Sequence, residues 1–286
     1  MNEIRTKAEE YIKMVKFEKK FCRGECMMKH HKEKNIRYFK SYTDDFVESK
    51  NQSYQLPKNY LWVHDNIFYR MTSWFLYLLT ALFAFLYCRL ILHVKIQNRW
   101  VLHHSRNTGC FLYGNHTQPI GDAFLPVWVF SPKRIYGVAS PANLAIPVLG
   151  PILPLIGALP LPDSMGGLRQ LHEAICLRVA EKNCVVFYPE AHVWPWYTGI
   201  RPFPSASFGF PAECGAPSFC MTTTYQKRRF GKKPGITVYL DGPFYPDKSL
   251  SKREQKEKLH KEIFNCMTQH SRKSTCSYIH YEKEMS

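Results

Sequence analysis

One long apolar run in the chain covers residues 71–88 and contains no charged residue. As an α-helix its 18 residues would measure about 27 Å, slightly less than the ~30 Å hydrocarbon core of a bilayer. Trp74 and Tyr87 near its ends suit the membrane interface, and basic residues flank it on both sides. The pattern predicts a membrane-attached helix, and the basic flanks favour one that dips in and stays on one face over a full span. A buried core helix is the alternative, which aromatic residues on every face disfavour.

A second uncharged stretch, residues 135–162, has a different pattern. Six of its residues are proline, with Gly150 and Gly157 between them. Because proline removes a backbone donor and breaks a helix, this stretch is not expected to span a membrane. It predicts short strands and turns that line an apolar cavity.

The remaining chain alternates between short β-favouring runs and helical periodicity, which is typical of an α/β fold. Asp163 and Ser164 are predicted to cap a helix. The apolar residues of that helix recur at helical spacing: Leu168, Leu171, Ile175 and Val179. A second helix is predicted over residues 252–267, and strands are predicted over 109–113, 184–188, 217–225 and 235–240.

These patterns divide the chain into four parts. Residues 1–55 are polar and rich in Lys and Glu, and they predict a solvated helical extension. Residues 56–94 are the membrane-associated helical segment, 95–247 the α/β domain, and 248–286 a charged C-terminal helix and tail.

Lys and Arg outnumber Asp and Glu by 39 to 23, which gives a formal net charge of +16. This excess predicts a polyanionic partner. Basic residues are spread along the chain without a nucleic-acid-binding motif, so we expect anionic membrane lipids and no nucleic acid. The ten Cys residues lack regular spacing, which favours reduced thiols in a cytoplasmic compartment over a disulfide framework.

One group of residues lies close enough in sequence to suggest a metal site: Cys22, Cys26, His30 and His31. However, the spacing of the two Cys is one residue longer than in the commonest zinc knuckle. No second ligand pair follows at the distance typical of zinc fingers. No metal is therefore predicted.

The most informative polar sequence begins at Asn115, directly after the first predicted strand. His116 is followed by turn residues and then by Asp122. An imidazole can take a proton near neutral pH, and a nearby carboxylate fixes its tautomer and stabilises the imidazolium. The pair is therefore predicted to be a general base and its orienting acid. Alternatively, Asp122 only caps the helix that follows.

A second polar sequence follows the strand predicted over residues 184–188. In open α/β sheets, ligands gather beyond the carboxyl ends of the strands. Glu190 and, eleven positions later, Arg201 would there position a hydroxylated or phosphorylated substrate. Alternatively, Glu190 is a salt-bridged loop residue and Arg201 a surface or headgroup contact. His192 is a second candidate imidazole, and the aromatic cluster at 194–197 is either a membrane-facing lip or ordinary packing.

In their order and separations these motifs resemble the 1-acylglycerol-3-phosphate acyltransferase family and its glycerolipid relatives. The matching features are Asn-His followed by Asp, an aromatic-Pro-Glu after a buried strand, and the Gly-Ala-Pro sequence at 215–217. The resemblance covers residues 95–245, roughly half the chain, and the apolar run is similar to that family's membrane-embedded helices. It implies an α/β fold with a mixed sheet flanked by helices.

The sequence departs from the family pattern at three places. Five residues rather than four separate His116 from Asp122, and Gly121 is expected to absorb the extra residue through backbone angles barred to others. The second and third motifs each lack an Arg that the resemblance assigns to the acceptor's phosphate. Arg201 is therefore predicted as the substitute phosphate contact, with Arg169 as a weaker choice.

The resemblance implies transfer of an acyl group from acyl-CoA or acyl carrier protein to a lysophospholipid hydroxyl, with no further cofactor. His116 would deprotonate that hydroxyl and Asp122 would hold the other ring nitrogen, while Asn115, Glu190 and Arg201 would bind the substrate. The protein is expected at a membrane, with its active site on the cytoplasmic face.

Two other classes of function are considered. A non-catalytic basic protein of the same fold that binds lipid or a membrane surface would account for the missing Arg residues and the altered His–Asp spacing. A hydrolase with a Ser or Cys nucleophile is disfavoured, because the chain contains no Gly-x-Ser-x-Gly sequence.

Overall fold

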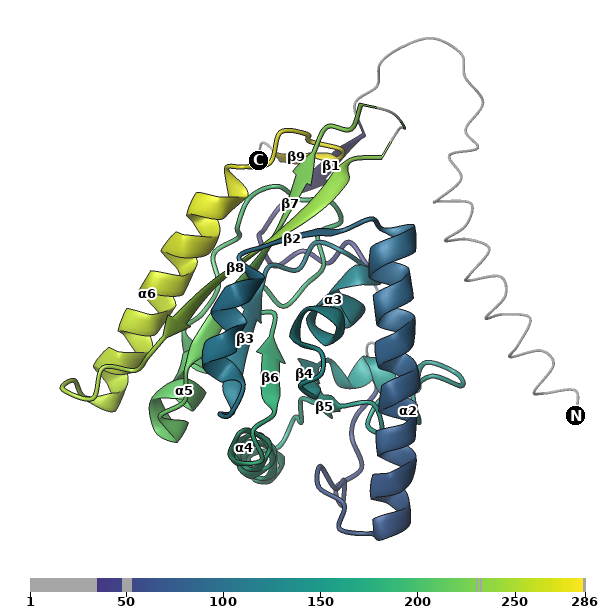
Figure 1. Cartoon of the computed structure of the whole chain (residues 1–286), viewed down its shortest axis with the longest axis vertical. Helices are drawn as coiled ribbons and strands as arrows, with labels where there is room; N and C mark the ends of the chain where they lie inside the picture. The colour runs from purple at the N-terminus through teal and green to yellow at the C-terminus, as the bar shows by residue number, and fades with distance from the viewer. Residues whose placement is uncertain (1–34, 48–52, 230, 232, 285–286) are drawn as a thin grey trace, which may run out of the picture.

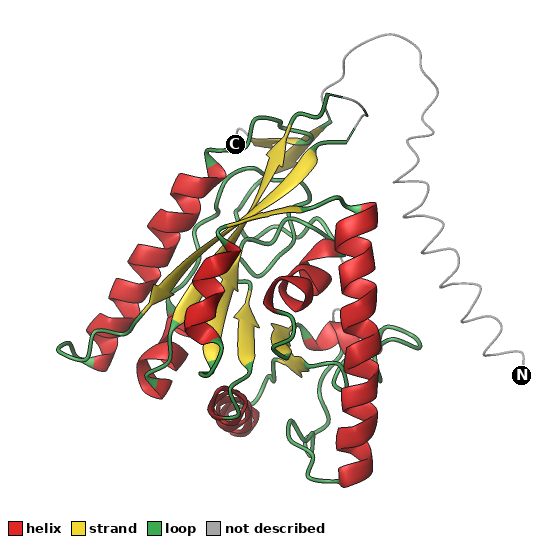
Figure 2. Cartoon of the chain, viewed as in Figure 1, coloured by secondary structure: helices red, strands yellow, loops and turns green. Residues whose placement is uncertain are grey.

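A computed structural model describes residues 35–47, 53–229, 231 and 233–284, so the Cys and His group at 22–31 and most of the N-terminal extension lie outside it. The described chain forms a seven-stranded sheet with helices on both faces (Figure 1, Figure 2). A separate pair of parallel strands, β1 (Ile36–Phe39) and β9 (His280–Lys283), joins the first and the last segments of the described chain. The predicted α/β fold with a mixed sheet flanked by helices is confirmed.

The large sheet has the strand order β2-β8-β7-β3-β6-β4-β5. Strands β3 to β7 run parallel, whereas β8 is antiparallel to β7 and β2 pairs in parallel with β8. The strand bounds are β2 (Lys95–Gln97), β3 (Cys110–Gly114), β4 (Ile135–Ala139), β5 (Ala158–Pro160), β6 (Cys184–Phe187), β7 (Ser218–Gln226) and β8 (Gly235–Phe244). Because β3 and β6 are neighbours and parallel, their carboxyl ends lie side by side.

Two apolar layers separate the sheet from its helices. Successive residues of β3 point to opposite faces, with Leu112 in the layer beneath α2 and α3 and Phe111 in the layer beneath α4 and α6. The helix bounds are α2 (Ile67–Leu86), α3 (Gly121–Phe130), α4 (Met165–Ala180), α5 (Gly209–Cys214) and α6 (Lys252–Ser271). Shorter helical turns are η1 (Tyr87–Ile91), η2 (Arg99–Ser105), η3 (Pro141–Ala145) and η4 (Ala206–Phe208).

The proline-rich stretch forms β4, η3 and β5 joined by turns, as predicted. Ser164 caps α4 by accepting a hydrogen bond from the backbone N of Gly167 at 3.1 Å. In that helix the predicted core residues are buried except Leu168, which is exposed. Helix α6 extends past its predicted end and packs three buried apolar residues, Leu259, Ile263 and Met267, against the second layer. The charged C-terminal helix is thus part of the core, while the four-part division itself stays a prediction.

Helix α2 begins at Ile67 because Asn66 Oδ1 accepts a hydrogen bond from the backbone N of Phe68 at 2.8 Å. One stripe of the helix faces the domain, where the Ser73 hydroxyl donates to a backbone oxygen at 2.6 Å and Tyr77 is buried. The other faces expose large apolar side chains: Phe68, Met71, Trp74, Phe75, Leu78, Leu79, Leu82, Phe83, Phe85 and Leu86. By length and composition, α2 together with η1 could cross a membrane. Within the most apolar 18 residues of this segment, 17% are buried.

Candidate active site

The turn after β3 is anchored to β7 by Asn115. Its side-chain Nδ2 donates to the backbone O of Thr223 at 3.0 Å, and its Oδ1 accepts from the backbone N of Thr223 at 2.7 Å. The side chain is buried and both its polar atoms are used, so it continues the pairing of β3 with β7 beyond the strand. Asn115 thus binds the protein backbone, whereas the sequence predicted that it would contact the substrate.

His116 and Asp122 meet despite the extra residue between them. Nδ1 of His116 lies 2.8 Å from Oδ2 of Asp122. The same oxygen accepts hydrogen bonds from the backbone N of Thr117 at 2.8 Å and of Gln118 at 2.9 Å, so the turn wraps around the carboxylate. Asp122 therefore holds the turn and the imidazole, in addition to lying in the first turn of α3.

The extra residue is not absorbed in the way predicted. Gly121 is not among the glycines with positive φ and instead begins α3. Its small size matters for packing, since a Cβ there would lie 2.9 Å from Cβ of Gln118. The backbone hydrogen bonds to Asp122, rather than unusual glycine angles, shape this turn.

The contact with Asp122 fixes the tautomer of His116. A carboxylate only accepts hydrogen bonds, so Nδ1 carries a proton, and in the neutral ring Nε2 presents a lone pair. The imidazole stacks on the ring of Tyr188 with centroids 4.5 Å apart. The side chain is 21% exposed, and no group among the described residues hydrogen-bonds Nε2. Nε2 is thus available to accept a hydrogen bond or a proton.

Tyr188 can stack on His116 because residue 114 is glycine, since a Cβ there would lie 2.6 Å from the Tyr188 ring. The Tyr188 hydroxyl donates to the backbone O of Asp122 at 2.6 Å. Burial raises the pKa of Tyr188 well above its usual value, and the charge of Asp122 adds to the rise. The phenol therefore stays protonated and acts as a rigid wall for the imidazole.

The backbone of the histidine turn is also held from behind. The backbone N of Trp194 donates to the O of His116 at 3.0 Å, and that of Trp196 donates to the O of Thr117 at 2.9 Å. The Thr117 hydroxyl lies 2.7 Å from the hydroxyl of Tyr225, whose pKa is raised by burial. Such support holds the turn and its imidazole in one orientation.

Glu190 and Arg201 form an ion pair in the interior beside this turn. Nη2 of Arg201 lies 2.9 Å from Oε2 of Glu190, and both side chains have 0% exposure. The guanidinium also donates to the backbone oxygens of Tyr42 and His192 and stacks on Trp194, 4.8 Å from its ring centroid. Burial raises the pKa of Glu190, and the charge of Arg201 opposes the rise.

This ion pair changes the roles expected of both residues. A guanidinium with no exposed surface does not reach a phosphate, so the predicted phosphate contact of Arg201 is not present in this arrangement. Glu190 Oε2 accepts a long hydrogen bond of 3.4 Å from the backbone N of His116. Glu190 is thus the salt-bridged residue of the alternative interpretation, and it supports the histidine turn from inside.

The other candidates also have protein partners. His192 Nδ1 lies 3.3 Å from Oδ2 of Asp45, and Arg169 pairs on the surface of α4 with Glu173 at 3.2 Å. Trp194 is fully buried among aromatic rings from both ends of the described chain. At Trp194, the aromatic cluster at 194–197 therefore packs in the interior and does not form a membrane-facing lip.

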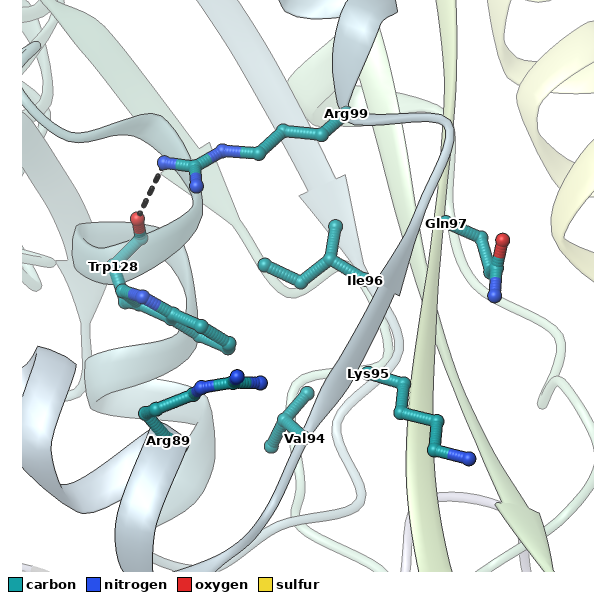
Figure 3. A pocket seen from close by; sticks show the side chains of 7 residues that line it. All are labelled: Arg89, Val94, Lys95, Ile96, Gln97, Arg99 and Trp128. Atoms are coloured by element: carbon teal, nitrogen blue, oxygen red, sulfur yellow. Dashed lines mark hydrogen bonds between the residues drawn. The ribbon is translucent and has the colours of Figure 1, made fainter.

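Basic side chains that follow the apolar run in the sequence line an open pocket of about 440 Å³. Arg89 and Arg99 lie on the same side of β2 as Ile96 and Trp128, whereas Lys95 points to the other side (Figure 3). Arg99 donates to the backbone O of Trp128 at 3.3 Å. The two guanidinium groups thus flank an apolar floor, which suits an anionic group joined to an apolar chain.

Helix α3 carries both Trp128 of this pocket and Asp122 of the His–Asp pair. Trp128 follows Asp122 by six residues, about 9 Å along the helix axis. The sequence signal was present in the alternation of β2, which places Ile96 on one face and Lys95 on the other. The pocket itself could not be predicted, because the packing of η1 and α3 brings Arg89 and Trp128 to the same strand from distant parts of the sequence.

A second cavity of about 640 Å³ lies between the first half of α2 and the proline-rich stretch. Pro151, Pro154 and Leu155 contribute to its wall, together with Phe68 and Tyr60. The prolines thus line a cavity as predicted. His116 is not among the residues that line either cavity.

Comparison with known proteins supports the fold. No protein-family model and no curated protein matches the sequence. Among solved structures, the chain is similar to the 1-acyl-sn-glycerophosphate (LPA) acyltransferase PlsC from Thermotoga maritima, with a TM-score of 0.51 and 11% sequence identity. The similarity covers 69% of this chain and 81% of that chain. At this identity the likeness shows a shared fold, which is that of an acyltransferase.

Proposed function

We propose that this protein transfers a fatty acyl group from an acyl thioester to a hydroxyl of a lysophospholipid such as 1-acylglycerol-3-phosphate. The observation that carries the proposal is the 2.8 Å contact between Nδ1 of His116 and Oδ2 of Asp122, which leaves Nε2 as the base. The fold shared with an LPA acyltransferase supports the same class of reaction. The donor is acyl-CoA or an acyl carrier protein, and no other cofactor takes part.

In the proposed reaction the acceptor hydroxyl attacks the thioester carbonyl while Nε2 of His116 removes its proton. Asp122 stabilises the imidazolium through Nδ1. When the tetrahedral intermediate collapses, the C–S bond breaks and the imidazolium returns the proton to the departing thiolate. The products are an ester and a free thiol.

The proposed activity is tested with purified full-length protein, acyl-CoA and a panel of lysophospholipids. We expect free thiol to be released in proportion to the acylated lipid, and only when an acceptor is present. Protein that binds lipid vesicles but releases no thiol with any acceptor would instead be the non-catalytic lipid-binding protein of the same fold.

We further propose that Arg89 and Arg99 bind a phosphate group of one substrate. The Arg89→Ala/Arg99→Ala variant is expected to raise KM for that substrate by about tenfold or more, because each charged hydrogen bond contributes ~1.5–3 kcal/mol. The kcat should change little, since groups far from the reacting atoms bind the ground state and the transition state alike. Titrating acyl-CoA and lysophospholipid separately identifies the substrate.

The matched control is Arg169→Ala, which removes an exposed guanidinium on α4 outside the pocket. Its KM values should stay at the wild-type level. Unchanged KM values for both substrates in the pocket variant would contradict the proposed phosphate site.

We also propose that α2 lies along the membrane surface rather than crossing the bilayer. Its inner stripe is attached to the domain at Ser73, Tyr77 and Ala84, over most of the helix length. A helix attached in this way still presents its outer apolar face to the acyl region of one leaflet. The net charge of +16 adds attraction to anionic headgroups.

The variant Phe75→Asp/Leu82→Asp is expected to weaken binding to phosphatidylglycerol-containing vesicles by more than about tenfold. Both side chains are exposed and seven residues apart, so they share the outer face of α2, and burying each contributes ~1.5–3 kcal/mol. Vesicle co-sedimentation measures the change. The control Met165→Asp replaces an exposed apolar residue at the start of α4 and should bind as wild type. Equal binding by all three proteins would rule out docking through α2.

A further inference from the structure

Four polar side chains that acyl transfer does not use meet on the α6 face of the sheet. Cys220 of β7 and Asp241 of β8 are register partners next to an irregularity in the ladder, so their side chains project to the same face. Cys266 and His270 of α6 are four residues apart on one side of the helix, where Cys266 packs against the apolar layer and His270 contacts Asp241 of β8. Cys220 belongs to the apolar layer beneath α6, on the opposite side of the sheet from α2 and α3.

The ligand atoms of this group are close to one another. The sulfurs of Cys220 and Cys266 and a carboxylate oxygen of Asp241 all lie within 4.8 Å of one another. The sulfur of Cys220 is 4.0 Å from Oδ2 of Asp241. Zinc bonds of about 2.3 Å to sulfur and 2.0 Å to oxygen place tetrahedral ligands ~3.5–3.8 Å apart, so a small inward movement would suffice.

We propose that Cys220, Cys266 and Asp241 bind a zinc ion, and that His270 positions the carboxylate of Asp241. Two thiolates select a borderline-soft ion such as zinc over magnesium or calcium, which prefer oxygen ligands. The three protein ligands come from two strands and one helix, so the ion would fasten α6 to the sheet. Its fourth ligand would be water.

His270 has the contacts expected of a residue that orients a metal ligand. Its Nε2 lies 3.0 Å from Oδ1 of Asp241, the oxygen that does not face Cys220. Its ring stacks on Tyr239 with centroids 4.7 Å apart, which fixes its plane. Lys273 lies over the same Tyr239 ring, 4.2 Å from its centroid, and adds positive charge near the anionic ligands. Partners of this kind tune affinity without touching the ion.

The experiment uses the full chain, purified after growth with zinc, then stripped and reloaded with cobalt. We expect about one zinc per chain and a thiolate-to-cobalt charge-transfer band. The Cys220→Ser/Cys266→Ser variant should lose both, whereas Cys276→Ser, which alters a half-buried thiol outside the group, should keep them. The His270→Gln variant should keep the band but bind zinc about 10- to 100-fold more weakly.

The other Cys and His group serves as an internal comparison. The Cys22→Ser/Cys26→Ser variant should retain the zinc and the cobalt band. The proposal is overturned if the wild type binds neither metal, or if the band survives Cys220→Ser/Cys266→Ser and disappears with Cys22→Ser/Cys26→Ser. It is also overturned if mass spectrometry of unreduced protein shows a Cys220–Cys266 disulfide in place of bound zinc. Circular dichroism of every variant verifies that the fold is intact.

Discussion

Replacing His116 with Ala is expected to slow acyl transfer by a factor of about 10² to 10⁴, because the acceptor hydroxyl loses its general base. The fold should persist, since Asp122 keeps its hydrogen bonds from the backbone N of Thr117 and Gln118. Thiol release from acyl-CoA at saturating lysophospholipid measures the rate. Vesicle binding and the circular dichroism spectrum should match those of the wild type.

Two further variants make this result specific. His192→Ala removes the other imidazole of this region, which pairs with Asp45, and should leave the rate near the wild-type level. Asp122→Asn should lower the rate by about 10²-fold or more, because the amide no longer enforces the tautomer with a proton on Nδ1. Full activity in His116→Ala, or a larger loss in His192→Ala, would refute His116 as the base.

Replacing Arg201 with Ala is expected to lower the free energy of unfolding by about 3–5 kcal/mol, because it leaves the carboxylate of Glu190 buried without its partner. The change also removes the stacking on Trp194. Urea unfolding followed by tryptophan fluorescence measures the loss. If Arg201 were instead a phosphate contact, the variant would unfold like the wild type and show only a raised KM.

The matched control is Arg169→Ala, which breaks an exposed pair on α4 worth no more than about 0.5 kcal/mol. The double variant Glu190→Leu/Arg201→Met removes both buried charges. It should be more stable than Arg201→Ala, since no charge is left unpaired. A double variant as unstable as the single one would show that packing, rather than charge, sets the cost.

Local patterns were sufficient to predict the central strands and the start of α4. Runs such as Cys184–Phe187 are apolar throughout because both faces of the sheet are covered, and Ser164 is a helix cap by its chemistry alone. The meeting of His116 with Asp122 was also predictable, since both belong to one turn. These features depend on residues close together in sequence.

The roles of polar residues were predicted less well, because they depend on partners far along the chain. Arg201 reads as a surface cation in sequence, yet its guanidinium binds the backbone O of Tyr42, 159 residues away. The side chain of Asn115 hydrogen-bonds the backbone of Thr223, 108 residues away. The hydrophobic periodicity of the sequence does not reveal such long-range pairing. The pairing of β1 with β9 was missed for the same reason.

The contacts of Trp194 have a consequence for biosynthesis. Its backbone N holds the O of His116, while its ring stacks on Tyr281 of β9 at 4.9 Å and packs against Phe39 of β1 at 4.8 Å. During translation, residue 281 leaves the ribosome long after the histidine turn has emerged. The turn therefore gains this support only after β9 has been made, and nascent chains or chains truncated before residue 281 should hold the imidazole loosely and work poorly.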